Sequence, residues 1–259
     1  MTPALPLIVL SLCLLCLAVP AGAQEDARGF GDGEAAKDYA DCMRLARSQP
    51  EQAFENATAW EGVGGAEAAR HCAAVSLLGL GHYGEAASRL QALAEAVKGP
   101  QAGLRPGLLA QAGQAWLLAA EPLRAYAVQS AALKLEPKNV ELWIDRAVTL
   151  ATAENYWEAI DDLNEAETLA PARADILIFR ASAYRFVEAN NLALEDVDRG
   201  LALDPNNPEG LLERGILRRL DGDDAGARAD WLRTLTVAPG SPAAEAAQTN
   251  LESLDVKAE

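Results

Sequence analysis

Residues 193–205 read ALEDVDRGLALDP, and both ends of this stretch recur along the chain at a fixed distance. The closing proline belongs to a series with a 34-residue step, and the opening alanine belongs to a second series with the same step. The series are Pro137, Pro171, Pro205 and Pro239, and Ala125, Ala159, Ala193 and Ala227. Identical spacing over three successive intervals is typical of a solenoid, so the sequence predicts a stack of short repeats.

The composition favours helices. Half of the 259 residues are apolar, whereas aromatic residues make up only 5%. Alanine and leucine are strong helix formers, and long runs of the β-branched and aromatic residues typical of strands are missing. We therefore expect an all-α protein.

The charge restricts the classes of partner. The formal net charge is -16 at pH 7. So acidic a chain is repelled by nucleic-acid phosphates and by anionic lipid surfaces. We therefore expect that the partner is not a nucleic acid.

The repeat resembles the tetratricopeptide repeat, a helix–turn–helix unit whose length equals this step. In that pattern position 8 is small, position 20 is alanine, position 32 is proline, and positions 4 and 24 are large. Here position 8 holds Gly113, Ala147, Ala181 and Gly215, and position 24 holds Leu163, Val197 and Trp231 in the last three units. The resemblance implies a right-handed α-solenoid in which the first helix of each unit, helix A, lines the concave side.

This frame divides residues 34–259 into three parts. Four regular repeats occupy residues 106–241, as units 106–139, 140–173, 174–207 and 208–241. Two degenerate repeats and a short insertion precede them at 34–105, and a capping helix with a tail follows at 242–259. An uncapped last repeat would leave its apolar face open to water, which is why the final amphipathic segment is interpreted as a cap.

Residues 1–23 are interpreted as a cleaved signal peptide. An apolar run from Leu7 to Val19 ends at Pro20 and the small-residue site Ala21-Gly22-Ala23, and the run is too short for a permanent membrane anchor. A lipoprotein signal is the alternative, although Leu precedes both cysteines of the segment where that signal has a small residue. We expect an exported, periplasmic protein that begins at Gln24, with a disordered lead-in over 24–33.

Two cysteines, Cys42 and Cys72, lie outside the signal segment. An exported protein meets an oxidising compartment, so an even number of thiols predicts a disulfide; two buried free thiols are the alternative. In the repeat frame both cysteines fall on neighbouring A helices, which pack side by side. The bridge would therefore join the two degenerate repeats.

The sequence contains no signature of an enzyme, a cofactor site or a metal site. The only histidines are His71 and His82, and both are interpreted as structural or surface residues. Residues 221–226 begin like a calcium loop, but Ala225 and Leu232 stand where oxygen ligands are required. The acidic run over residues 161–167 is interpreted as a solvated helix face.

The family binds partners through positions 2, 5, 9, 12 and 13 of helix A. Carried onto this chain, the resemblance predicts a mostly apolar groove with two arginines near its C-terminal end. The predicted groove residues are Gln114, Ile144, Val148, Ile178, Ser182, Arg185, Phe186, Leu212, Ile216 and Arg219. The Lys and Asn that some members use to grip a peptide carboxylate are missing, so an apolar peptide is expected. The alternatives are coverage by the protein's own helices and self-assembly into a homo-oligomer.

Overall fold

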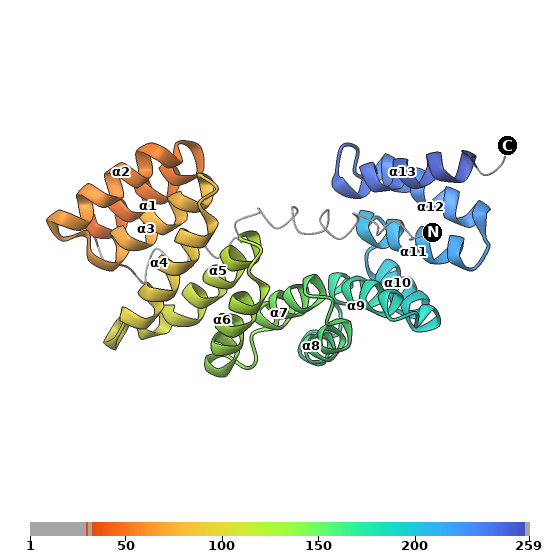
Figure 1. The fold of residues 1–259 in the computed structure, drawn as a ribbon, viewed down its shortest axis with the longest axis horizontal. Coiled ribbons are helices and arrows are strands. Elements are labelled where there is room, and N and C mark those ends of the chain that lie inside the picture. The colour runs from red at the N-terminus through yellow and green to blue at the C-terminus, as the bar shows by residue number, and fades with distance from the viewer. Residues whose placement is uncertain (1–29, 31–32, 257–259) are drawn as a thin grey trace, which may run out of the picture. The chain divides into compact units, whose positions relative to one another are not determined.

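The computed structural model describes residue 30 and residues 33–256, which are helical with short turns and contain no strand (Figure 1). The predicted signal peptide and most of the predicted lead-in lie outside the described residues. The N-terminal helices are α1 (Glu34–Ser48), α2 (Pro50–Trp60), α3 (Ala66–Gly79), α4 (Tyr83–Ala96), α5 (Arg105–Leu118) and α6 (Pro122–Leu135). The remaining helices are α7 (Val140–Thr152), α8 (Tyr156–Leu169), α9 (Ala174–Phe186), α10 (Asn190–Leu203), α11 (Pro208–Leu220), α12 (Asp224–Val237) and α13 (Pro242–Val256).

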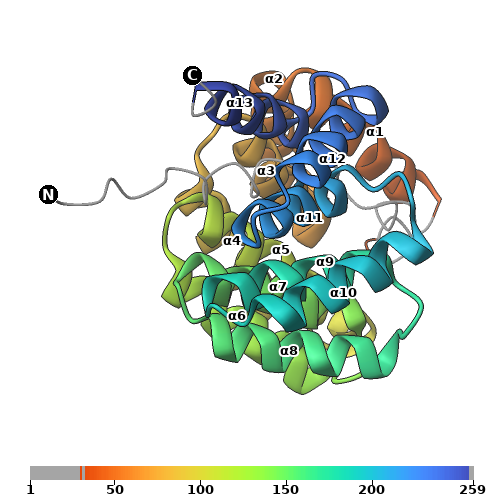
Figure 2. The ribbon, with the colours of Figure 1, turned by 90° about the vertical axis from the view of Figure 1, so that its right-hand side faces the viewer.

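Each unit of the sequence frame contains one helix pair, and the predicted all-α helix-pair solenoid is confirmed. Short helical turns η5 (Glu61–Gly65) and η6 (Gly99–Leu104) join the less regular pairs. The contacts separate an N-terminal unit, residues 30 and 33–149, from a C-terminal unit, residues 150–256. Within each unit successive helices pack against one another, and α13 packs on both α11 and α12 at the end of the stack (Figures 1 and 2).

The turn between the two helices of a pair has the same backbone in every regular repeat. Its central residue adopts a left-handed conformation, even where it is not glycine: Ala120 has φ 58°, Glu154 φ 62° and Glu188 φ 59°. The next residue donates its N–H to a carbonyl five residues earlier, as in Asn155 to Leu150 at 2.9 Å. This pattern ends a helix by satisfying its last carbonyls, so a periodic turn follows from the periodic sequence.

Positions 8 and 24 pack against each other, and the sizes of their side chains are matched. Trp231 is fully buried, and a Cβ added to Gly215 would lie 2.6 Å from its Cδ1. In the next repeat towards the N-terminus, the smaller Val197 belongs to the same buried cluster as Ala181. The residue at position 8 therefore sets how close the two helices of a pair can approach.

Buried arginine–aspartate pairs join the helices of the C-terminal unit. Arg180 donates two hydrogen bonds to Asp196, at 2.6 and 2.9 Å, and a third to Asn164 of the preceding repeat at 2.8 Å. One repeat later, Arg214 binds Asp230 and Asp198 in the same way. Each arginine therefore links its own helix pair to the preceding one.

The acidic run at 161–167 is not the solvated face that the sequence suggested. Asp162 is buried, and Glu167 accepts hydrogen bonds from Arg180 and Arg199, both at 2.5 Å. The prediction was wrong for these two residues because it considered helix α8 alone. Arginines of the following repeat neutralise part of that face once the helices are stacked.

The predicted disulfide is confirmed. Cys42 on α1 and Cys72 on α3 are bonded, with their Cα atoms 6.2 Å apart. Both sulfurs lie in a buried cluster with Ala57 and Ala73, so the bridge fastens the first helix pair to the second.

Candidate functional site

The predicted groove residues divide into buried and accessible sets. Those at position 5, Ile144, Ile178 and Leu212, are all buried. Ile178 packs against Gly200 and Gly210, where an added Cβ would lie 3.0 and 2.9 Å from its side chain. Position 5 thus holds the helices together, and its side chains are not available to a partner in this structure.

The capping helix covers part of the predicted apolar surface. Leu212 belongs to a buried cluster with Ala247 and Leu251 of α13, and the half-buried Ile216 packs against the same cluster. Coverage by the protein's own helices, one of the alternatives raised by the sequence, therefore applies to this end of the predicted groove.

Accessible side chains remain at the C-terminal ends of α9 and α11 and at the start of α8, and we call this strip the inner ridge. It consists of Tyr156, Arg185, Phe186, Arg219 and Leu220. Phe186 is 37% exposed and Leu220 is 59% exposed. Leu220 was missed in the sequence, although it occupies the same repeat position as Phe186 in the following unit. Ser182 lies half-buried one turn before the ridge on α9.

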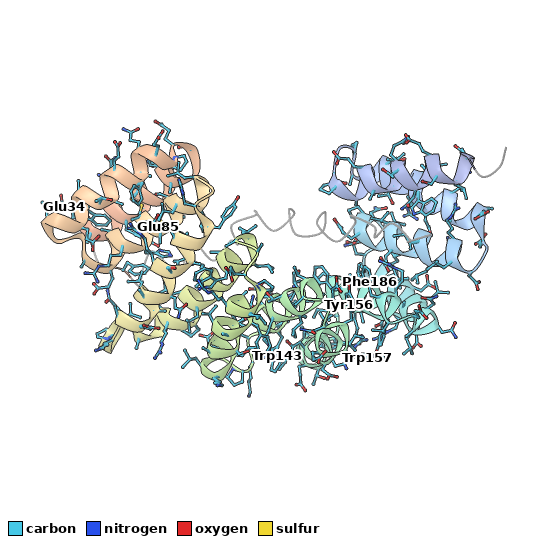
Figure 3. The ribbon with its side chains drawn as sticks, viewed as in Figure 1. Glu34, Glu85, Trp143, Tyr156, Trp157 and Phe186 are labelled. Carbon is cyan, nitrogen blue, oxygen red and sulfur yellow. A yellow bond between two sulfur atoms is a disulfide. The ribbon has the colours of Figure 1, made fainter. Side chains whose placement is uncertain are left out.

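The inner ridge contains a stack of two aromatic rings. The rings of Tyr156 and Phe186 are parallel within 5°, with their centroids 4.7 Å apart. Figure 3 labels both side chains. Tyr156 begins α8 and Phe186 ends α9, so the stack joins two successive repeats. Trp157 is also exposed, but Figure 3 places it away from the stack, on the other side of α8. The stack presents a rigid apolar surface.

The Arg185 side chain is held beside the aromatic stack by two contacts. Its guanidinium lies 4.5 Å from the centroid of the Phe186 ring and donates a 2.5 Å hydrogen bond to the buried Glu213 on α11. Burial and the nearby Glu154 carboxylate raise the pKa of the Tyr156 hydroxyl, while Arg185 opposes the shift. The tyrosine is therefore neutral at pH 7, next to a cation held in a defined orientation.

Arg219 differs from Arg185 in its hydrogen bonding. Its Nη1 atom is inaccessible to water and has no hydrogen-bond partner in the described chain. A buried guanidinium nitrogen without an acceptor lowers the stability of the fold. The inner ridge therefore combines exposed apolar side chains with one paired arginine and one incompletely paired arginine.

In the N-terminal unit the predicted groove residues are tied into polar contacts. Gln114 donates its amide to the carboxylate of Asp145, at 3.3 Å. Burial raises the pKa of Asp145 to about 6; the Gln114 hydrogen bond opposes the shift and the Glu141 charge adds to it. Val148 is half-buried on the same helix. These contacts join α5 to α7 and leave little apolar surface exposed at the predicted positions.

His71 lies in a buried hydrogen-bond chain across three A helices. The Tyr39 hydroxyl is 2.6 Å from Nδ1 of His71, and the Oε1 atom of Gln111 is 2.7 Å from Nε2. Because Oε1 of Gln111 only accepts, Nε2 carries the proton and the Tyr39 hydroxyl donates to Nδ1. Burial lowers the pKa of His71 to about 4, against the raising effect of the Gln111 hydrogen bond. The neutral imidazole thus has a structural role.

The described residues show neither a cluster of metal ligands nor a membrane-spanning helix. They contain no group of three or more His, Cys, Asp or Glu side chains placed to hold a metal ion. Within the same residues, no helix is both long and apolar enough to span a membrane.

The comparisons with known proteins agree on the fold. No family model matches the chain. It is 35% identical over 123 residues to tetratricopeptide repeat protein 36 from Bos taurus, a match that covers 46% of this chain and 59% of that protein. The chain thus spans about three-fifths of the length of this relative.

Solved structures resemble the chain at low identity. A TPR protein of Thermus thermophilus has a TM-score of 0.59 and 17% identity, covering 74% of this chain and all of its own. The C-terminal part of a TPR repeat-containing protein from Cytophaga hutchinsonii gives 0.62 and 14%, covering 84% and 95%. MamA from Desulfovibrio magneticus RS-1 gives 0.55 and 22%, covering 63% and 90%. At such identities the likeness concerns the fold.

Proposed function

We propose that this chain, whose fold is that of solved tetratricopeptide repeat proteins, is an exported scaffold that holds a protein partner through the inner ridge of its C-terminal unit. Solenoids of this kind present extended surfaces for protein–protein interaction. The observation that carries the proposal is the Tyr156–Phe186 stack, of which Phe186 is exposed and Tyr156 half-buried, with the Arg185 guanidinium over the Phe186 ring.

The ridge defines the chemistry of the partner. Exposed rings and the Leu220 side chain would accept apolar or aromatic side chains, because their contact surface is large and rigid. The half-buried Arg219 adds a positive charge at this end of the ridge, and this charge would favour a partner with negative charge nearby. We therefore propose a peptide segment in which apolar residues alternate with or adjoin Asp or Glu.

A double variant tests the ridge. Phe186→Ser with Leu220→Ser removes the exposed apolar groups and should weaken capture of the partner from an envelope extract at least tenfold. The matched control is Leu192→Ser with Leu203→Ser, which changes two leucines of α10 that are 47% and 49% exposed. Equal loss in both double variants, or no loss in the ridge variant, would reject the ridge as the recognition surface.

A charge reversal of Arg185 would not separate partner binding from folding. Arg185→Glu would place a second carboxylate against Glu213, which is buried, and would lower the stability of the fold together with binding. Arg219→Gln is preferable, since it removes the incompletely paired nitrogen and leaves the Arg185–Glu213 pair intact. It should weaken capture of the partner while leaving the melting temperature unchanged.

The proposed export has its own test. Intact-mass measurement of protein from the periplasmic fraction should give the chain that begins at Gln24. A lipid-modified mass would favour the lipoprotein alternative, and an uncleaved chain would reject export by a cleaved signal. Light scattering of the same material separates a scaffold that is monomeric by itself from a self-assembling homo-oligomer.

A further inference from the structure

The side chain of Phe30 precedes the first helix and is nonetheless buried. It is 5% exposed, and its ring is stacked on the imidazole of His71, with centroids 5.0 Å apart and planes 17° apart. The same ring lies 5.0 Å from that of Tyr39, tilted by 42°. The sequence placed Phe30 in a disordered lead-in, and this part of the prediction does not hold for Phe30. Three aromatic rings pack together where the sequence suggested no contact.

Tyr39 and His71, the two rings that contact Phe30, are held in place by other contacts. Tyr39 and His71 are hydrogen-bonded to each other, and His71 is bonded in turn to Gln111 of α5. The Cys42–Cys72 bridge fixes α1 to α3 one residue from His71. We call the surface formed by Tyr39 and His71 the aromatic socket. Because its own contacts fix its geometry, the socket does not depend on Phe30 for its shape.

Phe30 also borders an open hollow. The hollow has a volume of about 320 Å³, and Phe30 and Trp60 are its aromatic walls. Three carboxylates, those of Glu34, Asp38 and Glu67, stand on its lining, and Figure 3 labels Glu34 at the start of α1. The ring is therefore covered by the socket on one side and reachable from the hollow on another. Neither Tyr39 nor His71 lines the hollow, so an incoming side chain would reach the socket from the hollow only after Phe30 has left it.

We infer that the aromatic socket is a docking site for a phenylalanine of a partner peptide, which the chain's own Phe30 occupies when no partner is bound. A phenylalanine fits because the socket already stacks with one. The three carboxylates of the hollow favour a partner with a Lys or Arg near that phenylalanine, through charge complementarity. The partner is thus a basic–aromatic segment of the kind Arg/Lys-x-Phe. This chain contains such a segment itself, Arg28-Gly29-Phe30.

Occupation by Phe30 makes binding competitive. The tether between Phe30 and α1 is only a few residues long, so the local concentration of Phe30 at the socket is high. A partner must displace Phe30. The apparent affinity of the partner is therefore the intrinsic affinity multiplied by the fraction of time for which the socket is open. Removing the ring of Phe30 should therefore strengthen binding in trans.

The experiment uses a ten-residue peptide with the sequence of residues 24–33 as the probe, titrated onto the mature protein and its Phe30→Ala variant by calorimetry. The peptide should bind Phe30→Ala at least tenfold more tightly than the unchanged protein. A peptide with alanine in place of its phenylalanine should bind neither protein. Equal affinity for both proteins, or binding that does not need the peptide's phenylalanine, would overturn the inference.

Two further variants keep the test decisive. Phe30→Leu preserves an apolar side chain at the position if Phe30→Ala folds poorly, and it too should bind the peptide more tightly than the unchanged protein. Tyr39→Leu in the Phe30→Leu background removes half of the socket and should abolish that gain while the circular-dichroism spectrum stays helical. The ridge variant Phe186→Ser with Leu220→Ser should bind the peptide unchanged. Failure of the inner ridge and failure of the socket are therefore distinguishable.

Discussion

Gly215→Ala is the perturbation whose outcome follows most directly from the structure. The new methyl carbon would lie 2.6 Å from Cδ1 and 2.9 Å from Cε2 of Trp231, and closer still to its Nε1. These distances are far below van der Waals contact. The indole is fully buried and donates to the Leu212 carbonyl at 3.3 Å, so it has little freedom to move away.

The magnitude combines two opposing contributions. Overpacking of a close-packed site costs about 1–3 kcal/mol, and a site this tight belongs at the upper end. Replacing a glycine in the interior of a helix with alanine returns about 1 kcal/mol of helix propensity. The expected net loss is about 2 kcal/mol, which corresponds to a fall of about 4–8 °C in melting temperature for a chain of this size.

The control is Gly107→Ala. Gly107 lies in α5, and a Cβ built there meets nothing within 4 Å. Only the propensity contribution applies, so this variant should be more stable than the unchanged protein by up to about 1 kcal/mol. Urea unfolding followed by circular dichroism measures both variants under the same conditions.

A double-mutant cycle isolates the contact. Trp231→Leu leaves a cavity and should cost about 2–4 kcal/mol by itself. In that background Gly215→Ala should no longer destabilise, because the ring that opposes the methyl group is gone, and the coupling should be about 2–3 kcal/mol. The reasoning is refuted if Gly215→Ala raises stability as Gly107→Ala does, or if its cost is the same with leucine at position 231.

Four further predictions concern the buried polar groups and the disulfide. His71 titrates near pH 4 in the fold and near 6.5 when unfolded, so its contribution of about 3 kcal/mol is present above pH 6.5 and lost as pH falls towards 4. Asp145 changes stability in the opposite direction, because its raised pKa of about 6 means that the fold gains stability as pH falls and the carboxyl is protonated. The Asp145→Asn variant lacks this gain, so its free energy of unfolding in urea should fall more steeply between pH 7 and 4.5 than that of the unchanged protein. Reduction of the Cys42–Cys72 bridge, which closes a 30-residue separation, should cost about 3–4 kcal/mol, measured as a lower urea midpoint with dithiothreitol. Asp196→Ala removes the principal hydrogen-bond acceptor of the buried Arg180 guanidinium, and the free energy of unfolding should fall by about 3–5 kcal/mol in the same assay.

Separate checks accompany these predictions. His71→Phe should remove the loss of stability between pH 6.5 and 4 that the imidazole causes, and an unchanged pH profile in that variant would contradict the assignment. For the disulfide, thiol labelling of the denatured, unreduced protein should find neither Cys42 nor Cys72 free. For the Asp196 prediction, Asp198→Ala changes a half-exposed carboxylate on the same helix and should cost below about 1 kcal/mol.

The sequence by itself determined the repeat and its packing rules. The constant step between Pro137, Pro171 and Pro205 predicted the helix pairs, because a proline ends a helix wherever it stands in its interior. The step also placed a small residue at position 8 and a large one at position 24, whereas the contact between Gly215 and Trp231 was seen only in the structure. Even the missed pairs Arg180–Asp196 and Arg214–Asp230 occupy equivalent positions of successive repeats, so the sequence contained their signal.

Only the tertiary structure decided which residues of the predicted groove are accessible. The periodicity assigns Ile178 and Phe186 to one helix face, but burial depends on what packs over that face from other parts of the chain. The capping helix was predicted from the sequence, but the burial of Leu212 beneath it was not. The stacking of Phe30 on His71 joins residues 41 positions apart by a contact that the repeat period does not describe. A repeat pattern records the contacts that recur from unit to unit, whereas the surfaces left for a partner depend on the contacts that occur once.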